Sequence, residues 1–266
     1  MATVMPLTAV PPLRLRRPVR LAVFSPIYGL TGPVAGLRWW FLSRYLAAAG
    51  ANVTVFHHTA DTGTWQGVPV AGGAAPREVF VPERHPRLAR LGLLAGRLVA
   101  QAWGRRHGPF RSLVQAATEY LYFGAQSARG LIRAYETAYA ESPPDAAVGS
   151  FIGWSGVRAA LAANERGVPL LLEFRDPWRS YHPHTWRYHE RRIHRAVGRA
   201  AAVISVTPLL RERDEKEFGK PALYLPHGFP PEVLDSPRPV PAAGPLRVGY
   251  YGTIFYPYFD HESWFA

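Results

Sequence analysis

The stretch Leu170-Leu-Leu-Glu-Phe-Arg-Asp-Pro-Trp178 decides the fold, because a continuous apolar run ends in it abruptly at charged residues. Residues 168–174 show no alternation of apolar and polar side chains, which predicts a strand covered on both faces within a parallel sheet. Pro177 ends the strand, since proline has no N–H to give to a ladder. We therefore expect Arg175 and Asp176 at the carboxyl end of a central strand, the edge where open parallel sheets bind ligands.

Two interpretations of this edge stay open. In the first, Arg175 and Asp176 pair with each other and cap the next helix, and they have no further role. In the second, they belong to a ligand site together with the loop that follows, which is dense in stacking and hydrogen-bonding groups. The loop contains Trp178, Arg179, Tyr181, His182 and His184.

The rest of the chain alternates strands with helices, a pattern that calls for a doubly wound parallel α/β sheet. Strands are expected at 19–25, 52–57, 78–81, 145–149, 168–174, 201–206 and 222–225. Helices are expected at 34–49, 112–140, 157–166, 185–199 and 208–218. In the segment 34–49, Val34, Leu37, Phe41 and Tyr45 recur at helical spacing and favour a helix.

A glycine-containing turn, with Gly29, Gly32 and Gly36, joins the first strand to this helix. It does not match the G-x-G-x-x-G fingerprint of dinucleotide-binding proteins, and no Walker lysine follows it. Free N–H groups at a helix start favour a phosphate or another anion. Tight packing of strand against helix without any ligand explains the same glycines equally well.

The net charge of +12 comes almost wholly from arginine, since Lys216 and Lys220 are the only lysines. Arginine favours bidentate contact with phosphate and carboxylate, so the bias fits an anionic substrate, an anionic membrane or nucleic acid. Biased genome composition is the competing explanation. The absence of cysteine excludes disulfides, thiolate catalysis and zinc–sulfur sites. No apolar run is long enough for a transmembrane helix, so we expect a soluble or peripheral protein. The expected location is the cytoplasm.

The segment 84–111 combines an apolar helical repeat with arginines and no acidic residue. Basic amphipathic helices of this kind bind anionic membrane surfaces, here the inner face of the membrane. An ordinary surface helix with its apolar stripe on the core shows the same pattern. Both interpretations stay open.

The chain divides, by composition, into four parts. Residues 1–18 are expected to be a loose leader and residues 19–229 one α/β domain. Residues 230–245 are rich in proline and are expected to be a linker. Residues 246–266 resemble the first strand and glycine turn of a second domain that the sequence does not complete.

The order of several motifs resembles the amino-terminal half of a GT-B glycosyltransferase of the group called glycosyltransferase family 4. These motifs are the first glycine turn, Glu173-Phe-Arg-Asp-Pro-Trp178, Glu190-Arg-Arg-Ile-His194, Ile204-Ser-Val-Thr207, Pro226-His-Gly-Phe229 and Val248-Gly-Tyr-Tyr-Gly252. The resemblance runs from about Val19 to Gly252. It implies a Rossmann-like acceptor domain facing a second domain that holds most of the nucleotide-sugar donor, without cofactor or metal.

The resemblance also implies site residues. Asp176 would be catalytic, orienting or deprotonating the acceptor hydroxyl. Substrate would be bound by Gly29, Gly32, Ser150, Arg175, Trp178, His182, His227 and Gly228. Ser150 stands where many members have histidine, and His227 where asparagine is common. The acceptor is expected to be a glycan or a lipid-linked sugar.

Three functions compete. A sugar transferase, inactive as these 266 residues alone, explains the motif order. A non-catalytic binding module for an anionic glycan or lipid head group explains the same fold. A nucleic-acid-binding protein is the weakest of the three, because the arginines are not interleaved with an RNA-binding motif, and we expect no nucleic acid partner.

Overall fold

The computed structural model describes residues 15–29, 34–63, 75–82, 125–151, 153–181 and 186–227. Seven strands form one sheet in the order β3-β2-β1-β4-β5-β6-β7, and every neighbouring pair is parallel. The strands are β1 Arg20–Phe24, β2 Asn52–His57, β3 Arg77–Phe80, β4 Ala146–Ser150, β5 Leu170–Phe174, β6 Ala202–Ser205 and β7 Ala222–Tyr224. The helices are α1 Val34–Ala48, α4 Ala125–Ala138, α5 Trp154–Asn164, α6 Trp178–Tyr181, α7 Trp186–Arg199 and α8 Pro208–Phe218.

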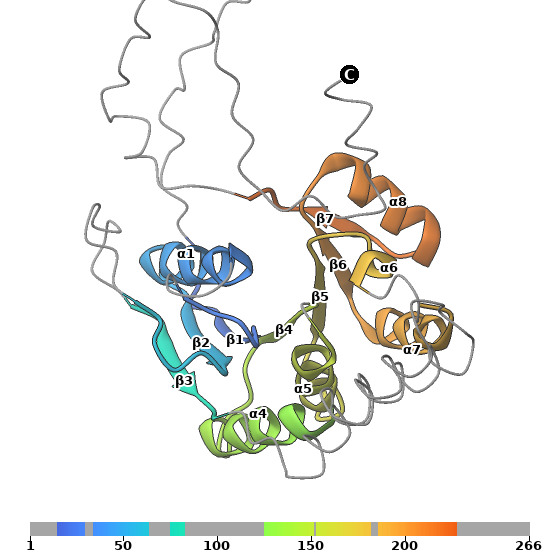
Figure 1. The fold of residues 1–266 in the computed structure, drawn as a ribbon. Helices are drawn as coiled ribbons and strands as arrows, with labels where there is room; N and C mark the ends of the chain where they lie inside the picture. The colour runs from blue at the N-terminus through green and yellow to red at the C-terminus, as the bar shows by residue number, and fades with distance from the viewer. Residues whose placement is uncertain are drawn as a thin grey trace, which may run out of the picture. The chain divides into compact units, whose positions relative to one another are not determined.

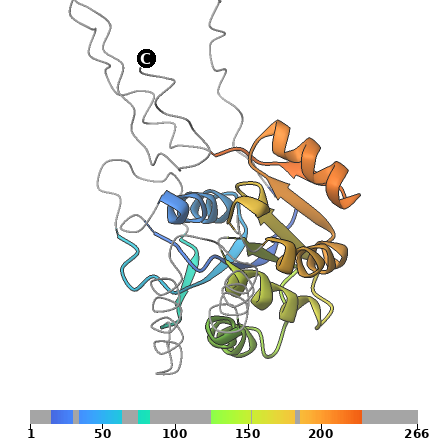
Figure 2. The ribbon, with the colours of Figure 1, turned by 45° about the vertical axis from the view of Figure 1, so that its right-hand side comes forward.

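Helices cover both faces of the sheet (Figures 1 and 2). Helices α4, α5 and α7 pack on one face, around a core that includes Phe24, Phe56 and Leu172. Helix α1 covers the other face with a smaller core that includes Trp39, Val55 and Val148. This doubly wound arrangement confirms the predicted fold class. The strand order reverses between β1 and β4, and the crevice outside the carboxyl ends at such a point is the usual ligand site of these sheets.

Strand β5 shows why the apolar run lacked alternation. Leu170, Leu172 and Phe174 belong to the core under α5 and α7, whereas Leu171 packs on the α1 side. Because successive side chains of a strand point to opposite faces, Glu173 also points to the α1 side. Its carboxylate is fully buried there.

The buried face of α1 does not follow the apolar residues that recur at helical spacing. Leu37, Phe41 and Tyr45 are only half-buried, whereas Trp39, Trp40, Ser43 and Ala47 are buried. The buried set also includes Arg38, at 5% exposure. The spacing of apolar residues does not indicate this buried face, because Arg38 and Ser43 form part of it. Both side chains are held there by buried hydrogen bonds.

The start predicted for the helix at 157–166 was wrong. Helix α5 begins at Trp154 rather than at residue 157, and Gly156 lies inside its first turn. A Cβ on Gly156 would come within 2.8 Å of the Phe24 carbonyl oxygen and 3.0 Å of that of Ser150. This glycine serves close packing of a helix on two strand ends, and not a turn as its sequence context indicates. The other strands and the helices at 34–49, 185–199 and 208–218 are confirmed to within about two residues.

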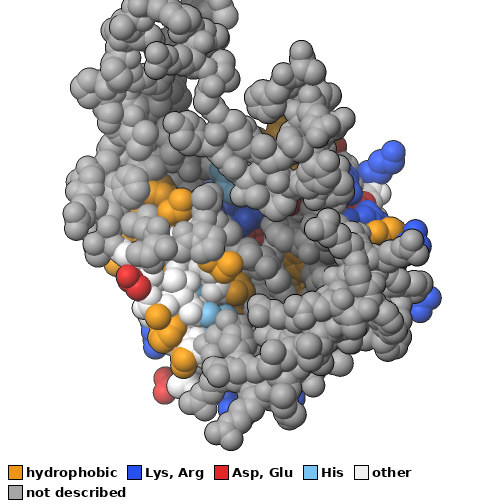
Figure 3. Space-filling view, in the orientation of Figure 1, with side chains coloured by type: hydrophobic (Ala, Val, Ile, Leu, Met, Phe, Trp, Pro, Cys, Tyr) orange, Lys and Arg blue, Asp and Glu red, His pale blue; other side chains and the backbone are white. Residues whose placement is uncertain are grey.

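Several predicted segments lie outside the described residues. They are most of the leader, the basic segment 84–111, the first part of the helix expected at 112–140, the linker and residues 246–266. Of the leader, Leu15 donates its N–H to the Ala49 carbonyl at 3.3 Å. In the described part of the chain no helix is long and apolar enough to cross a membrane. Figure 3 shows lysine and arginine side chains gathered along the edge formed by α7 and α8.

Asp214 gives the fold a measurable pH dependence. Asp214 lies on the buried side of α8, and its carboxylate accepts a hydrogen bond from the Ser205 hydroxyl of β6 at 2.7 Å. Burial, with a smaller contribution from Glu217, raises its pKa from 3.8 to about 6. Because the folded-state pKa is raised, the native protein loses stability as pH rises from about 4 to 6, and the loss is complete above pH 6.

We therefore expect Asp214→Asn to stabilise the protein at pH 8 by about 1–2 kcal/mol, since it removes a buried charge and keeps an acceptor for Ser205. At pH 3.5 the gain should vanish. Urea unfolding at both pH values measures it, with the exposed Glu212→Gln on the same helix as the control. A lower stability of the variant at pH 8 would contradict the assignment.

Candidate functional site

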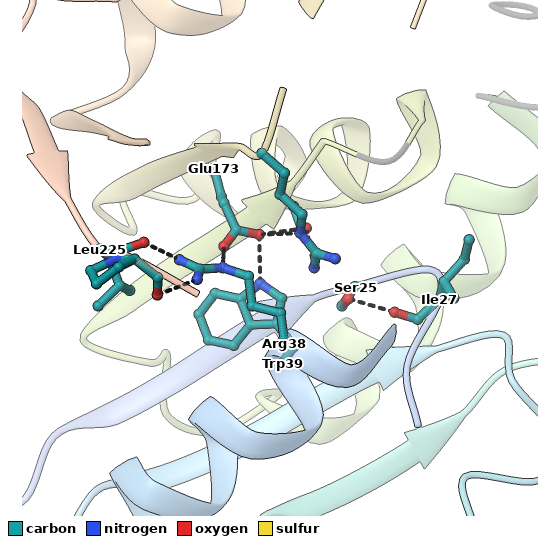
Figure 4. A network of polar contacts seen from close by, with 9 residues as sticks. Ser25, Ile27, Arg38, Trp39, Glu173 and Leu225 are labelled. Carbon is teal, nitrogen blue, oxygen red and sulfur yellow. Dashed lines mark hydrogen bonds and ion pairs between the residues drawn. The ribbon is translucent and has the colours of Figure 1, made fainter. Parts of the chain in front are cut away.

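A buried polar cluster at the carboxyl edge of the sheet is centred on Glu173. Its carboxylate accepts four hydrogen bonds: Arg38 Nε at 2.6 Å, Trp39 Nε1 at 2.8 Å, Ser150 Oγ at 2.6 Å and Arg175 Nε at 3.2 Å. Figure 4 shows the Arg38 and Trp39 side chains reaching Glu173 from α1. We call Glu173, Arg38, Ser150 and Arg175 the Glu173 cluster.

Local sequence explains how each member reaches the cluster. Ser150 is the last residue of β4 and Glu173 the second-last residue of β5, and the two are register partners, so their side chains leave the same face of the sheet. Arg175 follows β5 directly and also donates from Nη2 to Ser150 Oγ at 3.1 Å. Arg38 lies near the start of α1, which covers this face of the sheet.

Arg38 also ties the cluster to the far end of the sheet. Its Nη1 donates to the Pro226 carbonyl and its Nη2 to the Leu225 carbonyl, both at 2.7 Å. These carbonyls follow β7, immediately before His227. The guanidinium therefore satisfies two main-chain groups of the late proline-glycine segment and one buried carboxylate in a single planar contact.

The cluster carries a net positive charge, since it holds two guanidiniums, each less than a tenth exposed, against one carboxylate. Burial by itself would raise the pKa of Glu173, but Arg175 and Arg38 together hold it below its ordinary value. Glu173 is therefore ionised. The two guanidiniums of Arg38 and Arg175 are suited to contact with phosphate or carboxylate groups.

Two exposed titratable side chains lie over the cluster. Asp176 follows Arg175 at the end of β5, and His227 follows Pro226 after β7. The His227 imidazole is exposed to solvent on one side and lies against protein on the other. This partial desolvation is the largest cause of its lowered pKa. Arg38 and Arg175 lower it further, while Glu173 and Asp176 oppose them. His227 and Asp176 are therefore near each other although 51 positions separate them, and His227 is neutral at pH 7.

The first glycine turn packs tightly on the rest of the domain. Gly29 has φ +120, and a Cβ there would come within 2.6 Å of Thr62 Cα. A Cβ on Gly36 would meet the Gly29 carbonyl oxygen at 2.9 Å. Tyr28 anchors the turn: its hydroxyl donates to Glu78 Oε1 at 3.1 Å and accepts from Arg44 at 2.9 Å. These contacts account for Gly29 and Gly36 by packing, and an anion at the turn stays a prediction.

Gly36→Ala should lower the free energy of unfolding by about 1–3 kcal/mol, because the added methyl meets main-chain atoms that cannot rotate away. Gly198→Ala is the matched control. It lies within α7, where an added Cβ meets nothing within 4 Å, and it should stabilise by about 0.5–1 kcal/mol. Chemical unfolding measures both changes. Equal effects of the two substitutions would contradict the close approach at Gly36.

Trp178 lies in a different environment from the other predicted site residues. It is 1% exposed and its indole N–H donates to Glu217 Oε1 at 2.8 Å. Arg179 stacks over the Trp178 ring at 4.6 Å and over the Trp186 ring at 5.0 Å, and it bonds Glu217. These contacts fasten α6 to α7 and α8. Contact of Trp178 with an acceptor stays a prediction.

The structure thus brings Ser150, Arg175, Asp176 and His227 together at one edge. Gly32, His182 and Gly228 lie outside the described residues. Sequence reasoning missed Glu173 and Arg38. The available signal was a carboxylate second from the end of a strand otherwise apolar on both faces, since a buried carboxylate requires a cationic partner. No group of three His, Asp or Glu side chains suited to a metal ion occurs among the described residues.

Comparison with known proteins gives a likeness in structure only. No protein-family model matches the sequence, and no curated protein matches it. Similar solved structures include sucrose-phosphate synthase from Thermosynechococcus elongatus, at 12% identity and a TM-score of 0.44, with 78% of this chain and 48% of that chain covered. UGT73P12 of Glycyrrhiza uralensis, solved with glycyrrhetinic acid 3-O-monoglucuronide, gives 12% identity, a TM-score of 0.43 and coverage of 78% and 48%.

A third structure, UGT2 of Phytolacca americana with UDP-2fluoro-glucose and pterostilbene, gives 11% identity, a TM-score of 0.46 and coverage of 80% and 55%. These neighbours are GT-B glycosyltransferases. The chain spans about half the length of the three proteins. Membership of glycosyltransferase family 4 stays a prediction.

Proposed function

We propose that this chain is the acceptor-side part of a glycosyltransferase, which moves a sugar from a nucleotide-sugar donor to an acceptor hydroxyl. The observation that carries the proposal is the Glu173 cluster, with its two buried guanidiniums next to the β1–β4 reversal, and the exposed carboxylate of Asp176 beside it. Both features suit glycosyl transfer from a nucleotide sugar. A positive field stabilises the leaving diphosphate, and a carboxylate takes the proton of the attacking hydroxyl.

In the proposed reaction the acceptor oxygen forms a bond to the anomeric carbon while the bond from that carbon to the diphosphate oxygen breaks. The nucleoside diphosphate leaves with the bonding electron pair, and the acceptor proton passes to Asp176. Gly29 and Gly32 approach the diphosphate through their main chain. Arg175 and Ser150 hold the edge in place, and His227, neutral at pH 7, is available for a hydrogen bond to a sugar hydroxyl.

The direct test is transfer by the protein that the complete gene encodes. We expect release of nucleoside diphosphate from one member of a panel of donors, such as UDP-glucose or GDP-mannose, that depends on an added glycan or lipid-linked acceptor. Residues 1–266 alone should give no multiple turnovers. Acceptor binding without release from any donor would contradict transfer and favour the alternative, a non-catalytic module for an anionic glycan or lipid head group.

The proposal includes a cytoplasmic protein that associates with the inner face of the membrane through segment 84–111. Each basic group near an anionic leaflet contributes about 1 kcal/mol of binding. The segment has no acid to oppose its arginines Arg84, Arg87, Arg90, Arg97, Arg105, Arg106 and Arg111.

Co-sedimentation with vesicles of anionic lipid should therefore show binding that is lost in 1 M salt, where the Debye length falls to about 3 Å. Replacement of Arg87, Arg90 and Arg97 by Gln should also abolish it. Equal binding to neutral vesicles, or binding to neither kind, would contradict the membrane role and favour an ordinary helix packed on the protein core.

A further inference from the structure

A second polar hollow lies at the opposite, amino edge of the sheet. It is a cavity of about 450 Å³ between the first residues of three strands and the end of α4. Its polar lining includes Arg20, Asn52, Thr54, Arg77, Tyr139 and Ser142. The volume falls within the range of small-molecule sites. Nothing in the proposed transfer reaction uses these residues.

The strand register explains why these side chains meet. Arg20 pairs with Asn52, and Thr54 pairs with Arg77, across neighbouring parallel strands. Because side chains alternate between the faces of a strand, all four lie on the face that packs against α4. Tyr139 and Ser142 close the hollow from the end of that helix.

The charges in the cavity are mostly positive. Arg20 donates to the Ser142 hydroxyl, and its main-chain N–H donates to Asp145 Oδ2 at 2.7 Å. Among the described residues Arg77 has no ion-pair partner. One acid, Glu141, lies in the lining, and its side chain is exposed.

The Tyr139 phenol lies near both guanidiniums. Burial raises its pKa most, while hydrogen bonding with Thr54 and the charges of Arg77 and Arg20 oppose that shift. Two arginines from different strands therefore approach one hydroxyl group. Two guanidiniums with interspersed hydroxyl and amide groups match an oxyanion that is attached to a polyhydroxyl body.

We infer that this cavity binds a phosphate monoester of a small sugar, with the phosphate between Arg20 and Arg77 and the sugar hydroxyls on Asn52, Thr54 and Tyr139. The inference goes beyond the proposed transfer reaction and does not depend on it. The cavity lies at the amino ends of the strands, and the Glu173 cluster lies at the carboxyl ends of strands in the same sheet. A ligand here is therefore additional to a donor and an acceptor.

Calorimetric titration of residues 1–266 with glucose 1-phosphate, inorganic phosphate and glucose tests the inference. We expect glucose 1-phosphate to bind more tightly than inorganic phosphate, and glucose not to bind. Arg77→Gln and Arg20→Gln should each weaken the binding of glucose 1-phosphate roughly tenfold or more, since each removes a charge-assisted hydrogen bond. Arg129→Gln, on an exposed position of α4, is the matched control and should leave the dissociation constant unchanged.

The Arg77 side chain is exposed, so Arg77→Gln should leave the melting temperature unchanged. A loss of binding in this variant therefore cannot be attributed to misfolding. On binding, amide resonances of residues 52–54 should shift in NMR spectra, whereas those of residues 173–176 should not. Absence of binding, equal binding of glucose, equal affinity for bare phosphate, or full affinity in the Arg77 variant would each overturn the inference. None of these outcomes bears on transfer at the Glu173 cluster.

Discussion

Glu173→Gln should lower the free energy of unfolding by about 3–5 kcal/mol, the largest stability change that we expect from one substitution in this chain. The variant leaves two buried guanidiniums without a carboxylate, and its amide nitrogen would face donors that it cannot accept from. Domains of this kind are stable by about 5–15 kcal/mol, so much of the stability is at stake. Urea unfolding at pH 7, followed by tryptophan fluorescence, measures the loss.

The control is an ion pair of the same chemistry on the surface. Glu165 meets Arg199 at 3.0 Å, and its side chain is 63% exposed. Glu165→Gln should therefore change stability by less than about 1 kcal/mol. A similarly small effect of Glu173→Gln would show that the cluster does not hold α1 to the sheet.

The two arginines should differ in the same experiment. Arg38→Met should lower the free energy of unfolding more than Arg175→Met, because Arg38 also donates hydrogen bonds to the Leu225 and Pro226 carbonyls. Acid unfolding provides an independent test. The pKa of Glu173 is lowered in the folded state, so its stabilisation is present above the unfolded pKa and is lost as pH falls through the folded pKa. The Gln variant should lack this contribution to the acid limb.

The sheet could be predicted from sequence because its determinants are local. Apart from Glu173, residues 168–174 are apolar on both faces, and a strand buried on both sides in a parallel sheet accepts such a run. Pro177 then fixes the end of the strand, and with it the edge where Arg175 and Asp176 lie. Each step needs only a few neighbouring residues.

The interior of the site could not be predicted, because its determinants are distant in sequence. Arg38 and Glu173 are 135 positions apart, and nothing near either residue indicates the other. For Trp178, the local sequence indicated a site residue that the structure places in the core. An aromatic residue just after a strand end has the pattern of a stacking group in a site, yet its indole is buried against Glu217, which only the packing of α6 on α8 determines. Local pattern places residues at an edge, and long-range contacts decide which of them are buried.

Asp176→Asn should reduce transfer by the complete enzyme by about 10²- to 10⁴-fold, the range that a positioned general base contributes. The side chain is exposed, so the same substitution should change the free energy of unfolding by less than about 0.5 kcal/mol. A large loss of rate with little loss of stability distinguishes Asp176 from Glu173, whose replacement mainly lowers the free energy of unfolding. Initial rates at saturating donor and acceptor, together with urea unfolding, measure both quantities.

The control for Asp176 is another exposed acid away from the Glu173 cluster, and Glu212→Gln on α8 provides it with an unchanged rate. The two kinetic constants distinguish a proton acceptor from a residue that only positions the sugar. Asp176→Asn should mainly lower kcat, while His227→Gln should mainly raise the Michaelis constant for the acceptor. Turnover of Asp176→Asn within threefold of wild type would remove Asp176 from the chemistry.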